Sequence, residues 1–539
     1  MERPTRSVPQ RQELPSDADE IAQLVGGRRV VVASNRGPVE FQPDAAGRLH
    51  SRRGAGGVVT ALASLAGLLP LSWIAVAMTA GDRQAFSAPE SPAREARLGR
   101  QRVRVRYVTV EPAAYARYYD HVSNELLWFL QHYLWDPART PNLTERDYLA
   151  WDAGYRLVNE ALATAIVDEV CRPWAVHNGN ARGVERNAIV LLQDYHLYLA
   201  PAAVRRRLPR ATIQQFIHIP WPSVRYWELL PEHFLREIVT SLTACDVVGF
   251  QTPLDARNFL GCVQEMFPDA RIDFAAGRLV RGRHQTLARA YPITIDPSEV
   301  ERVLRSAAAR DAERELAPLL GDDARLIVRV DRLEPTKNVL RGLMAYEALL
   351  RDEPDLRGKV RHLVFLVPSR QSLDVYRRYE RDVRRAIGRI NAAYGTSNWR
   401  PVTAFFENNR ARALVAMSQA DVLLVNPLID GMNLVAKEGA VANRRDGVIV
   451  LSRTAGAFQE MGPGVLPLTP TDIAESTMRL REALEMAPEE RHRLATCARD
   501  IVLGESLPGW MLAQIRDAAQ VRAGKQPRER AAGKVAQRA

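Results

Sequence analysis

The chain has 539 residues, of which 46% are hydrophobic and 25% are charged, as in a soluble globular protein of two or three domains. Its net charge of +11 would suit a nucleic-acid-binding protein, but residues 521–539 alone hold six basic side chains against one acidic side chain. The basic excess is therefore concentrated at one end, and we expect a disordered basic tail over residues 523–539 and no nucleic-acid partner.

The N-terminal region has no targeting or membrane segment that we recognise. Residues 1–27 are polar and lack the apolar core of a secretory signal, so we expect them to be disordered. Residues 61–78 are uncharged, but Gly67 and Pro70 interrupt them and the stretch is short for a membrane span of about 20 residues. A buried helix, a turn and a strand over residues 73–78 fit better than a membrane helix.

The cysteine and histidine pattern predicts neither a disulfide framework nor a metal site. Four cysteines lie far apart in the chain and form no CxxC pair, which favours a reducing, cytoplasmic location. The sequence also contains no HExxH motif and no cluster of histidine and cysteine residues.

Short apolar runs alternate with helical patterns along the chain. In the first half they lie at residues 29–35, 73–78, 102–110, 188–193, 212–219 and 246–250, and in the second half at residues 325–331, 362–369, 421–427 and 447–452. Such runs are typical of parallel strands covered by helices on both faces. Two series of them predict an α/β protein with two doubly wound, Rossmann-like domains. We place these domains at residues 28–297 and 298–504, followed by a helix at 505–522.

Polar residues follow the strands of the first half, where open α/β sheets bind ligands. Arg36 ends the motif SNR after the first strand, and Gly57 ends a glycine cluster whose amides could approach a phosphate. A plain tight loop is the simpler reading of that cluster. Asp194 and His218 follow the fourth and fifth strands. They could hold sugar hydroxyls, and two satisfied core polar residues are an equal alternative.

Two motifs in the second half are suited to a diphosphate. Arg332 and Lys337 follow the first strand of that half, where a guanidinium fork and an ammonium could neutralise phosphate charge; a salt bridge at a helix start is the alternative. The segment DGMNLVAKE, residues 430–438, follows a strand and begins a helix. The amides of Met432, Asn433 and Leu434 would form an anion site there, and Glu438, one turn beyond, could accept ribose hydroxyls.

These segments together resemble the trehalose-6-phosphate synthase family of retaining glycosyltransferases, which includes pseudo-glycosyltransferase relatives. The resemblance covers about residues 29–460 and rests on ordered motifs: SNR, GG, YYDHVSNELLW, DYHL, HIPWPS, GFQTPLDARNFL, DRLEPTK, PSR, GRIN, DGMNLVAKE and LSRTAGA. It implies a GT-B fold of two facing domains with the active site in the cleft between them. The first domain would then bind the acceptor, the second the nucleotide sugar, and the helix at 505–522 would cross back to the first.

The resemblance also implies roles for individual residues. Arg332 and Lys337 would bind the donor diphosphate, Asp430 and His218 the donor sugar, and Asp194 the acceptor hydroxyls. The other donor-binding positions would be Gly57, Met432, Asn433, Leu434 and Glu438. The acceptor set, in which arginines hold a phosphate, would be Arg36, Tyr119, Trp128, Arg370 and Arg410.

Several departures from the family pattern leave the acceptor and the donor base open. Related sequences often read HDYHL where this chain has Gln193 before Asp194, and LDYxKG where it has LEPTKN. Thr294, Ile429 and Phe129 also depart from the pattern, and the usual WxGWxG segment is absent.

Three functions therefore compete. The first is transfer of glucose from a nucleotide sugar, with UDP-glucose favoured over GDP- and ADP-sugars, to glucose 6-phosphate, forming trehalose 6-phosphate. The second is coupling of an activated cyclitol to a phosphorylated aminocyclitol, and the third is a non-catalytic nucleotide-sugar regulator. We expect no cofactor, no metal and no membrane partner, and the oligomeric state stays open. Because no pair of carboxylates suited to a double displacement is evident, we expect a front-face reaction in which the leaving diphosphate takes the acceptor's proton.

Overall fold

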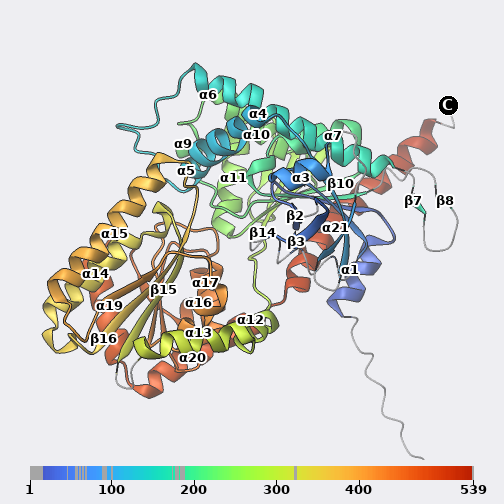
Figure 1. Cartoon of the computed structure of the whole chain (residues 1–539). Helices are drawn as coiled ribbons and strands as arrows, with labels where there is room; N and C mark the ends of the chain where they lie inside the picture. Colours follow the sequence, from blue (N-terminus) through green and yellow to red (C-terminus); the bar gives the residue numbers. More distant parts are fainter. Residues whose placement is uncertain are drawn as a thin grey trace, which may run out of the picture.

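The protein is described from a computed structural model of the chain, shown in Figure 1. The described residues are 16–44, 47–54, 59, 62, 66, 69–87, 94–98, 101–172, 174–175, 181–182, 188–320 and 324–536.

The N-terminal domain is built on a ten-stranded sheet in the order β12-β13-β14-β11-β10-β9-β1-β4-β6-β5. The strands from β14 to β6 in this order are parallel, and β5, β12 and β13 are antiparallel at the two edges. Their bounds are β1 (Val30–Ala33), β4 (Leu71–Val76), β5 (Arg94–Leu98), β6 (Gln101–Val108), β9 (Ile189–Gln193), β10 (Thr212–Phe216), β11 (Val247–Phe250), β12 (Arg271–Asp273), β13 (Arg278–Arg281) and β14 (His284–Ala290). Two hairpins lie outside it, β2 (Val39–Pro43) with β3 (Leu49–Arg53), and β7 (Trp174–Ala175) with β8 (Ala181–Arg182).

The C-terminal domain is built on a six-stranded parallel sheet in the order β17-β16-β15-β18-β19-β20. Its strands are β15 (Arg325–Leu333), β16 (Val360–Pro368), β17 (Val402–Phe405), β18 (Val422–Val425), β19 (Val448–Ser452) and β20 (Leu466–Leu468). Strand order reverses between β15 and β18 here, and between β1 and β9 in the first sheet. Ligands of doubly wound sheets bind beyond the carboxyl ends of the strands at such reversals, so two candidate crevices are defined by topology alone.

Helices cover both faces of each sheet (Figure 1), because alternate side chains of the central strands, such as Val31 and Val32, are fully buried on opposite faces. Around the first sheet are α1 (Asp17–Val25), α3 (Ala80–Ala85), α4 (Pro112–Ala116), the π-helix η1 (Arg117–Leu127), α5 (Trp128–Gln131), α6 (Glu145–Ala150), the π-helix η2 (Trp151–Arg156), α7 (Leu157–Cys171), η3 (Tyr195–Leu197), α8 (Ala200–Arg207), α9 (Val224–Trp227), α10 (Glu232–Leu242) and α11 (Pro253–Met266). Around the second are α12 (Pro297–Leu304), α13 (Ala307–Leu320), η4 (Pro335–Lys337), α14 (Val339–Asp352), η5 (Pro354–Leu356), α15 (Asp374–Tyr394), α16 (Arg410–Ser418), α17 (Leu434–Ala442), α18 (Phe458–Met461), η6 (Gly462–Gly464), α19 (Ile473–Glu485) and α20 (Pro488–Leu503).

The last helix, α21 (Leu507–Ala536), returns from the C-terminal domain and packs on the N-terminal sheet. The Trp510 indole donates to the Tyr291 carbonyl oxygen over 3.0 Å. Asp517 accepts hydrogen bonds from Arg289 at 2.9 Å and from the Tyr291 hydroxyl at 2.6 Å. Two buried polar anchors therefore join the end of the chain to the first domain.

The structure differs from the sequence expectation at both ends. Residues 1–27 were expected to be disordered, but α1 occupies Asp17–Val25, capped by the Ser16 hydroxyl and burying Ile21 and Val25. Its Glu20 pairs with Arg516 of α21, so the segment gains a partner that lies far away in the sequence. The sequence predicts a disordered tail from residue 523, but α21 continues as a helix to Ala536.

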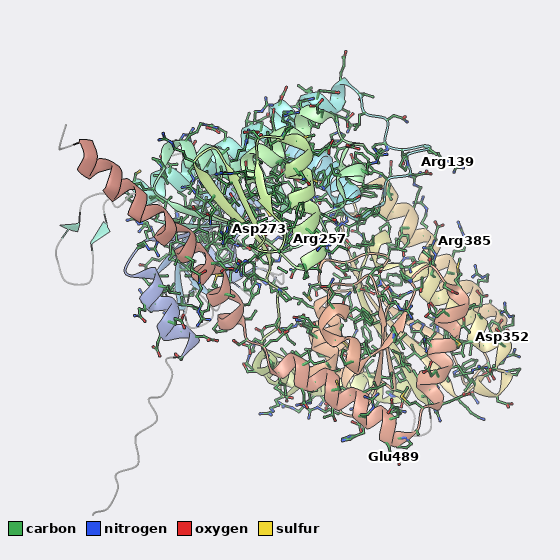
Figure 2. The ribbon with its side chains drawn as sticks, turned by 180° about the vertical axis from the view of Figure 1, so that it is seen from behind. Arg139, Arg257, Asp273, Asp352, Arg385 and Glu489 are labelled. Atoms are coloured by element: carbon green, nitrogen blue, oxygen red, sulfur yellow. The ribbon has the colours of Figure 1, made fainter. Side chains whose placement is uncertain are left out.

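Charged side chains lie mainly on the outside of both domains. Figure 2, seen from behind, shows Arg385, Asp352 and Glu489 on the outer surface of the C-terminal domain and Asp273 and Arg257 on the N-terminal domain. Many of the exposed charges pair locally, such as Arg385 with Asp382 at 3.1 Å. Such pairs contribute little to stability. The buried charges described next are therefore the unusual ones.

Candidate functional site

Two residues predicted from the first half lie together at the carboxyl ends of β9 and β10. Oδ1 of Asp194 accepts a hydrogen bond from the amide of His218 over 3.2 Å. Asp194 also adopts a φ of 70°, a left-handed conformation that is uncommon for a residue other than glycine and is concentrated at functional sites. Adjacent parallel strands thus bring the predicted carboxylate and imidazole into one place.

The electrostatic surroundings of Asp194 place it at the junction of the two domains. Burial raises the pKa of its carboxyl group to about 7, while amide hydrogen bonds and then the charges of Arg370 and Arg332 act in the opposite direction. Both arginines belong to the C-terminal domain, so they approach this carboxyl group from across the junction. The carboxyl group therefore changes protonation state near neutral pH.

The imidazole of His218 lies between two glutamine side chains. Its Nε2 is 3.0 Å from Oε1 of Gln193, and Nε2 of Gln251 is 3.4 Å from its Nδ1. Burial lowers the pKa of His218 to about 3, so the ring is neutral at physiological pH. Because an amide oxygen only accepts hydrogen bonds, this amide orientation assigns the ring proton to Nε2.

The predicted acceptor residues Tyr119 and Trp128 lie on one continuous helical segment, η1 and α5. The Tyr119 ring stacks between Tyr115 at 5.4 Å and His196 at 5.8 Å, within 13° of parallel to each. Arg36 is exposed, and its charge, after burial and the charge of Arg370, lowers the pKa of His196 to about 3. An aromatic surface flanked by cations therefore lies beside Asp194.

Arg370 reaches from the C-terminal domain into this aromatic surface. It follows β16, has a φ of 43°, and its guanidinium lies 4.0 Å from the centre of the Trp128 ring. Nε donates to Oδ1 of Asn124 over 2.9 Å, and Nη2 donates to the Tyr195 hydroxyl over 3.3 Å. Its side chain is only 10% exposed, so Arg370 lies largely buried at the junction between the domains.

The predicted diphosphate residues lie at the ends of β15 and β18. Nζ of Lys337 forms an ion pair with Asp430, whose Oδ2 also accepts from the Asn433 side chain over 3.0 Å. Burial acts to raise the pKa of Asp430, but the Lys337 charge and hydrogen bond hold it below its usual value. Arg332 is the more accessible cation, with 44% of its side chain exposed.

The loop before α17 contacts the N-terminal domain directly. A Cβ atom on Gly431 would lie 2.0 Å from the His218 carbonyl oxygen, so only glycine fits. Asn433 has a φ of 75° and its side-chain oxygen caps the amide of Ala436 at 3.3 Å. Among the described residues, the amides of Met432, Asn433 and Leu434 donate no backbone hydrogen bond, which leaves them available to an anion.

Arg410 does not lie with the other predicted acceptor residues. It begins α16, donates to Oε1 of Glu438 over 2.8 Å, and pairs with Glu299 of α12 at the same distance. The structure therefore groups Arg410 with a predicted donor residue, because α16 and α17 pack side by side in the C-terminal domain. Glu438 remains 20% exposed.

One residue of this site was missed by sequence reasoning. Glu334 has a fully buried side chain that pairs with both Arg332 and Arg370. Its place in the motif DRLEPTK was the available signal, but one partner, Arg332, lies on β15 and the other, Arg370, lies beyond the end of β16. Gly57 lies outside the described residues.

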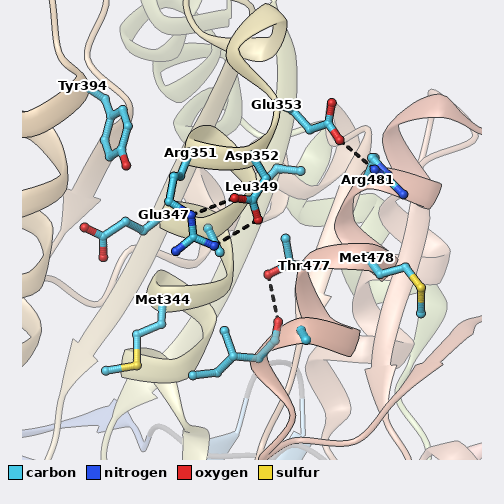
Figure 3. Close-up of a pocket in the computed structure, with 13 residues that line it drawn as sticks. Met344, Glu347, Leu349, Arg351, Asp352, Glu353, Tyr394, Thr477, Met478 and Arg481 are labelled. Atoms are coloured by element: carbon cyan, nitrogen blue, oxygen red, sulfur yellow. Dashed lines mark hydrogen bonds and ion pairs between the residues drawn. The ribbon is translucent and has the colours of Figure 1, made fainter.

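A cavity of about 680 Å³ lies elsewhere, between α14 and α19 on the outer side of the C-terminal domain (Figure 3). Met344 and Thr477 are among its lining residues, and four of its charged groups pair with one another, Arg351 with Asp352 and Glu353 with Arg481. None of the predicted site residues lines it, so it is not the candidate site.

In the parts of the chain that the structure describes, no group of three or more His, Cys, Asp or Glu side chains is arranged to hold a metal ion. No described helix combines the length and apolar character needed to cross a bilayer.

Comparison with known proteins gives concordant matches over most of the chain. The model of glycosyltransferase family 20 matches residues 28–520. A bifunctional trehalose-6-phosphate synthase/phosphatase from Thermoproteus tenax is 32% identical over 86% of this chain, which spans 60% of that longer protein. A validamine 7-phosphate valienyltransferase from Streptomyces hygroscopicus is 29% identical over 91% of this chain and 94% of its own length. The crystal structure of a UDP-forming α,α-trehalose-phosphate synthase from Burkholderia xenovorans, in complex with glucose 6-phosphate, superimposes with a TM-score of 0.74 at 27% identity, covering 91% of this chain and 99% of that one.

Proposed function

Because the chain belongs to glycosyltransferase family 20, we propose that it transfers glucose from UDP-glucose to glucose 6-phosphate and forms α,α-trehalose 6-phosphate and UDP. The observation that carries this proposal is the convergence of Arg332 and Arg370 at Trp128. Their guanidiniums lie 5.3 and 4.0 Å from the centre of its ring. A reaction that transfers a sugar from a diphosphate ester to a sugar phosphate needs two adjacent phosphate sites, and each of these two cations would serve one of them.

The donor diphosphate would be held by Lys337, Arg332 and the free amides at the start of α17. Binding would draw the Lys337 ammonium toward phosphate oxygens, leaving Asp430 hydrogen-bonded to Asn433 and available to a sugar hydroxyl. The glycosidic bond to the diphosphate breaks as a bond forms to the anomeric oxygen of the acceptor. The acceptor's proton passes to the leaving phosphate oxygen. Fixed cations at that oxygen lower the barrier because negative charge increases there in the transition state.

Retention without a covalent intermediate is supported by the roles of two carboxylates of the site, Asp430 and Asp194. Asp430 is ion-paired with Lys337, and Asp194 accepts a hydrogen bond from the amide of His218. A double displacement needs two carboxyl groups about 5 Å apart, one of them a free nucleophile. We assign Asp430 to a donor-sugar hydroxyl and Asp194 to acceptor hydroxyls, so neither carboxylate is left to act as the nucleophile and the front-face reaction is the better chemical fit.

The second candidate is C–N coupling of a nucleotide-activated cyclitol to a phosphorylated aminocyclitol. The observation in its favour is Gln193, which replaces the histidine common in related sequences and holds His218 by a hydrogen bond of 3.0 Å. That change touches a residue predicted to hold the donor sugar. A non-catalytic regulator is disfavoured by the retained pair of Lys337 and Asp430.

A donor-by-acceptor panel tests these proposals. UDP-, GDP- and ADP-glucose and a nucleotide-activated valienol would each be combined with glucose 6-phosphate and with validamine 7-phosphate, and the products weighed by mass spectrometry. Our proposal expects a disaccharide phosphate from UDP-glucose and glucose 6-phosphate. Product only from the cyclitol pair would favour the second candidate, and no product from any pair would favour the regulator.

A further inference from the structure

The buried carboxylate of Glu334 lies between the two proposed phosphate sites. Its Oε1 is 2.9 Å from Nη2 of Arg332, and its Oε2 is 3.0 Å from Nη1 of Arg370. Oε1 also accepts a hydrogen bond from the Thr336 hydroxyl over 3.2 Å. Each oxygen of one carboxylate therefore holds a different arginine.

The carboxylate stays ionised in spite of its burial. Burial acts to raise the pKa of Glu334, but Arg332, Arg370 and Lys337 together bring it below its usual value. An isolated buried charge would be very costly, so these cations are what keep Glu334 in place. Conversely, Glu334 lets two guanidiniums share the face of Trp128, because without it like charges would lie together unscreened.

The two arginines differ in how firmly they are held. Arg370 is 10% exposed and has further hydrogen bonds to Asn124 and the Tyr376 hydroxyl, each 2.9 Å long. Arg332 is 44% exposed. Binding of a diphosphate to Arg332 would order it against Glu334, and the ordered carboxylate would then hold Arg370 in a single orientation toward its own ligand. The acceptor phosphate would then lose less binding free energy to the ordering of Arg370, and it would bind more tightly.

We propose that Glu334 is a positioning residue that couples the donor and acceptor sites, so that a bound nucleotide diphosphate increases the affinity for the acceptor phosphate. The inference rests on the proposed function, because Arg332 and Arg370 must serve different ligands. By linkage, the acceptor must increase nucleotide affinity by the same factor. Glu334 itself contacts neither ligand in this account.

The test is to measure this factor by isothermal titration calorimetry. The Kd of glucose 6-phosphate would be measured without UDP and with saturating UDP, and the Kd of UDP with and without glucose 6-phosphate. We expect the unaltered protein to show a factor of about 5 or more in both directions. Glu334→Gln keeps the shape of the side chain but removes its charge, and the factor should fall to below about 2.

Two further variants make the test specific. Glu334→Asp keeps the charge and is the residue that related sequences often have at this position, so it should retain coupling even if Glu334→Gln folds poorly. Asp517, on α21, is another carboxylate that pairs with an arginine, Arg289. Asp517→Asn should leave the coupling factor between the two ligands unchanged. If the coupling factor of Glu334→Gln lies within twofold of that of the unaltered protein, the inference is wrong but the proposed function is not. The same holds if the unaltered protein has a coupling factor of 1. Failure of the unaltered protein to bind UDP or glucose 6-phosphate would overturn the proposed function and the inference together.

Discussion

Removal of the Lys337 ammonium should reduce turnover far more than it weakens donor binding. The charge on the diphosphate rises as the glycosidic bond breaks, so an interaction with Lys337 strengthens in the transition state. Loss of one such group typically costs about 100-fold or more in kcat. Lys337→Ala should therefore show this loss with a nearly unchanged KM for UDP-glucose, measured by coupled UDP release.

The same substitution also removes one partner of a buried ion pair, which must be separated from the catalytic effect. The side chains of Lys337 and Asp430 are 11% and 14% exposed, and breaking such a pair from one side costs about 3–5 kcal/mol of stability. In the double variant Lys337→Ala with Asp430→Asn, no unpaired carboxylate remains, so the thermal midpoint should recover in large part while turnover stays low.

Two other substitutions complete this test. Arg332→Lys should have a low turnover, because the point charge of a lysine cannot replace the bidentate fork of a guanidinium. Lys359→Ala, at an exposed position of the same domain, is the control and should behave as the unaltered protein. If Lys337→Ala folds and turns over normally, the assignment of the diphosphate site is wrong.

Three further outcomes are expected. Arg370→Ala should raise the KM for glucose 6-phosphate, leaving the Kd of UDP measured without acceptor nearly unchanged; equal losses at both sites would contradict the separate assignment. Burial raises the pKa of Asp194 to about 7, so its contribution to stability is full below about pH 4 and is lost as the pH rises to about 7. Asp194→Asn should therefore be more stable than the unaltered protein above pH 7, with the difference shrinking as the pH falls, and a constant difference in unfolding free energy would argue against this environment. Activity should persist in excess EDTA, and a complete loss that added Mg²⁺ or Mn²⁺ restores would contradict the metal-free reaction.

The sequence predicted the fold well, because the central strands are buried on both faces. All ten apolar runs contain a strand, and the expected two doubly wound sheets are confirmed. Six strands of the two sheets, β5, β12, β13, β14, β17 and β20, were missed. In β5 and β12 the exposed, charged residues, such as Arg94 and Arg271, carry no continuous apolar signal. The helix α1 was missed because its buried face packs against α21, almost 500 residues away in the chain.

The candidate site was predicted in its parts but not in its connections. The positions of Asp194, His218, Lys337 and Asp430 follow from the rule that ligand residues come after parallel strands, although their roles stay predictions. The grouping of Arg410 with Glu438 depends on how α16 packs beside α17, which no local pattern reveals. The same holds for Glu334, because its proposed role depends on the two arginines that the fold places beside its carboxylate.

The chemistry of the product tests the central claim most directly. Purified protein would be incubated with UDP-glucose and glucose 6-phosphate, and the product examined by proton NMR for the coupling constants of its anomeric protons. We expect UDP release in a one-to-one ratio with a disaccharide phosphate in which both anomeric protons have the small coupling constants of an α,α-1,1 linkage. A product with one β-linked residue, or release of free glucose without transfer, would contradict the account.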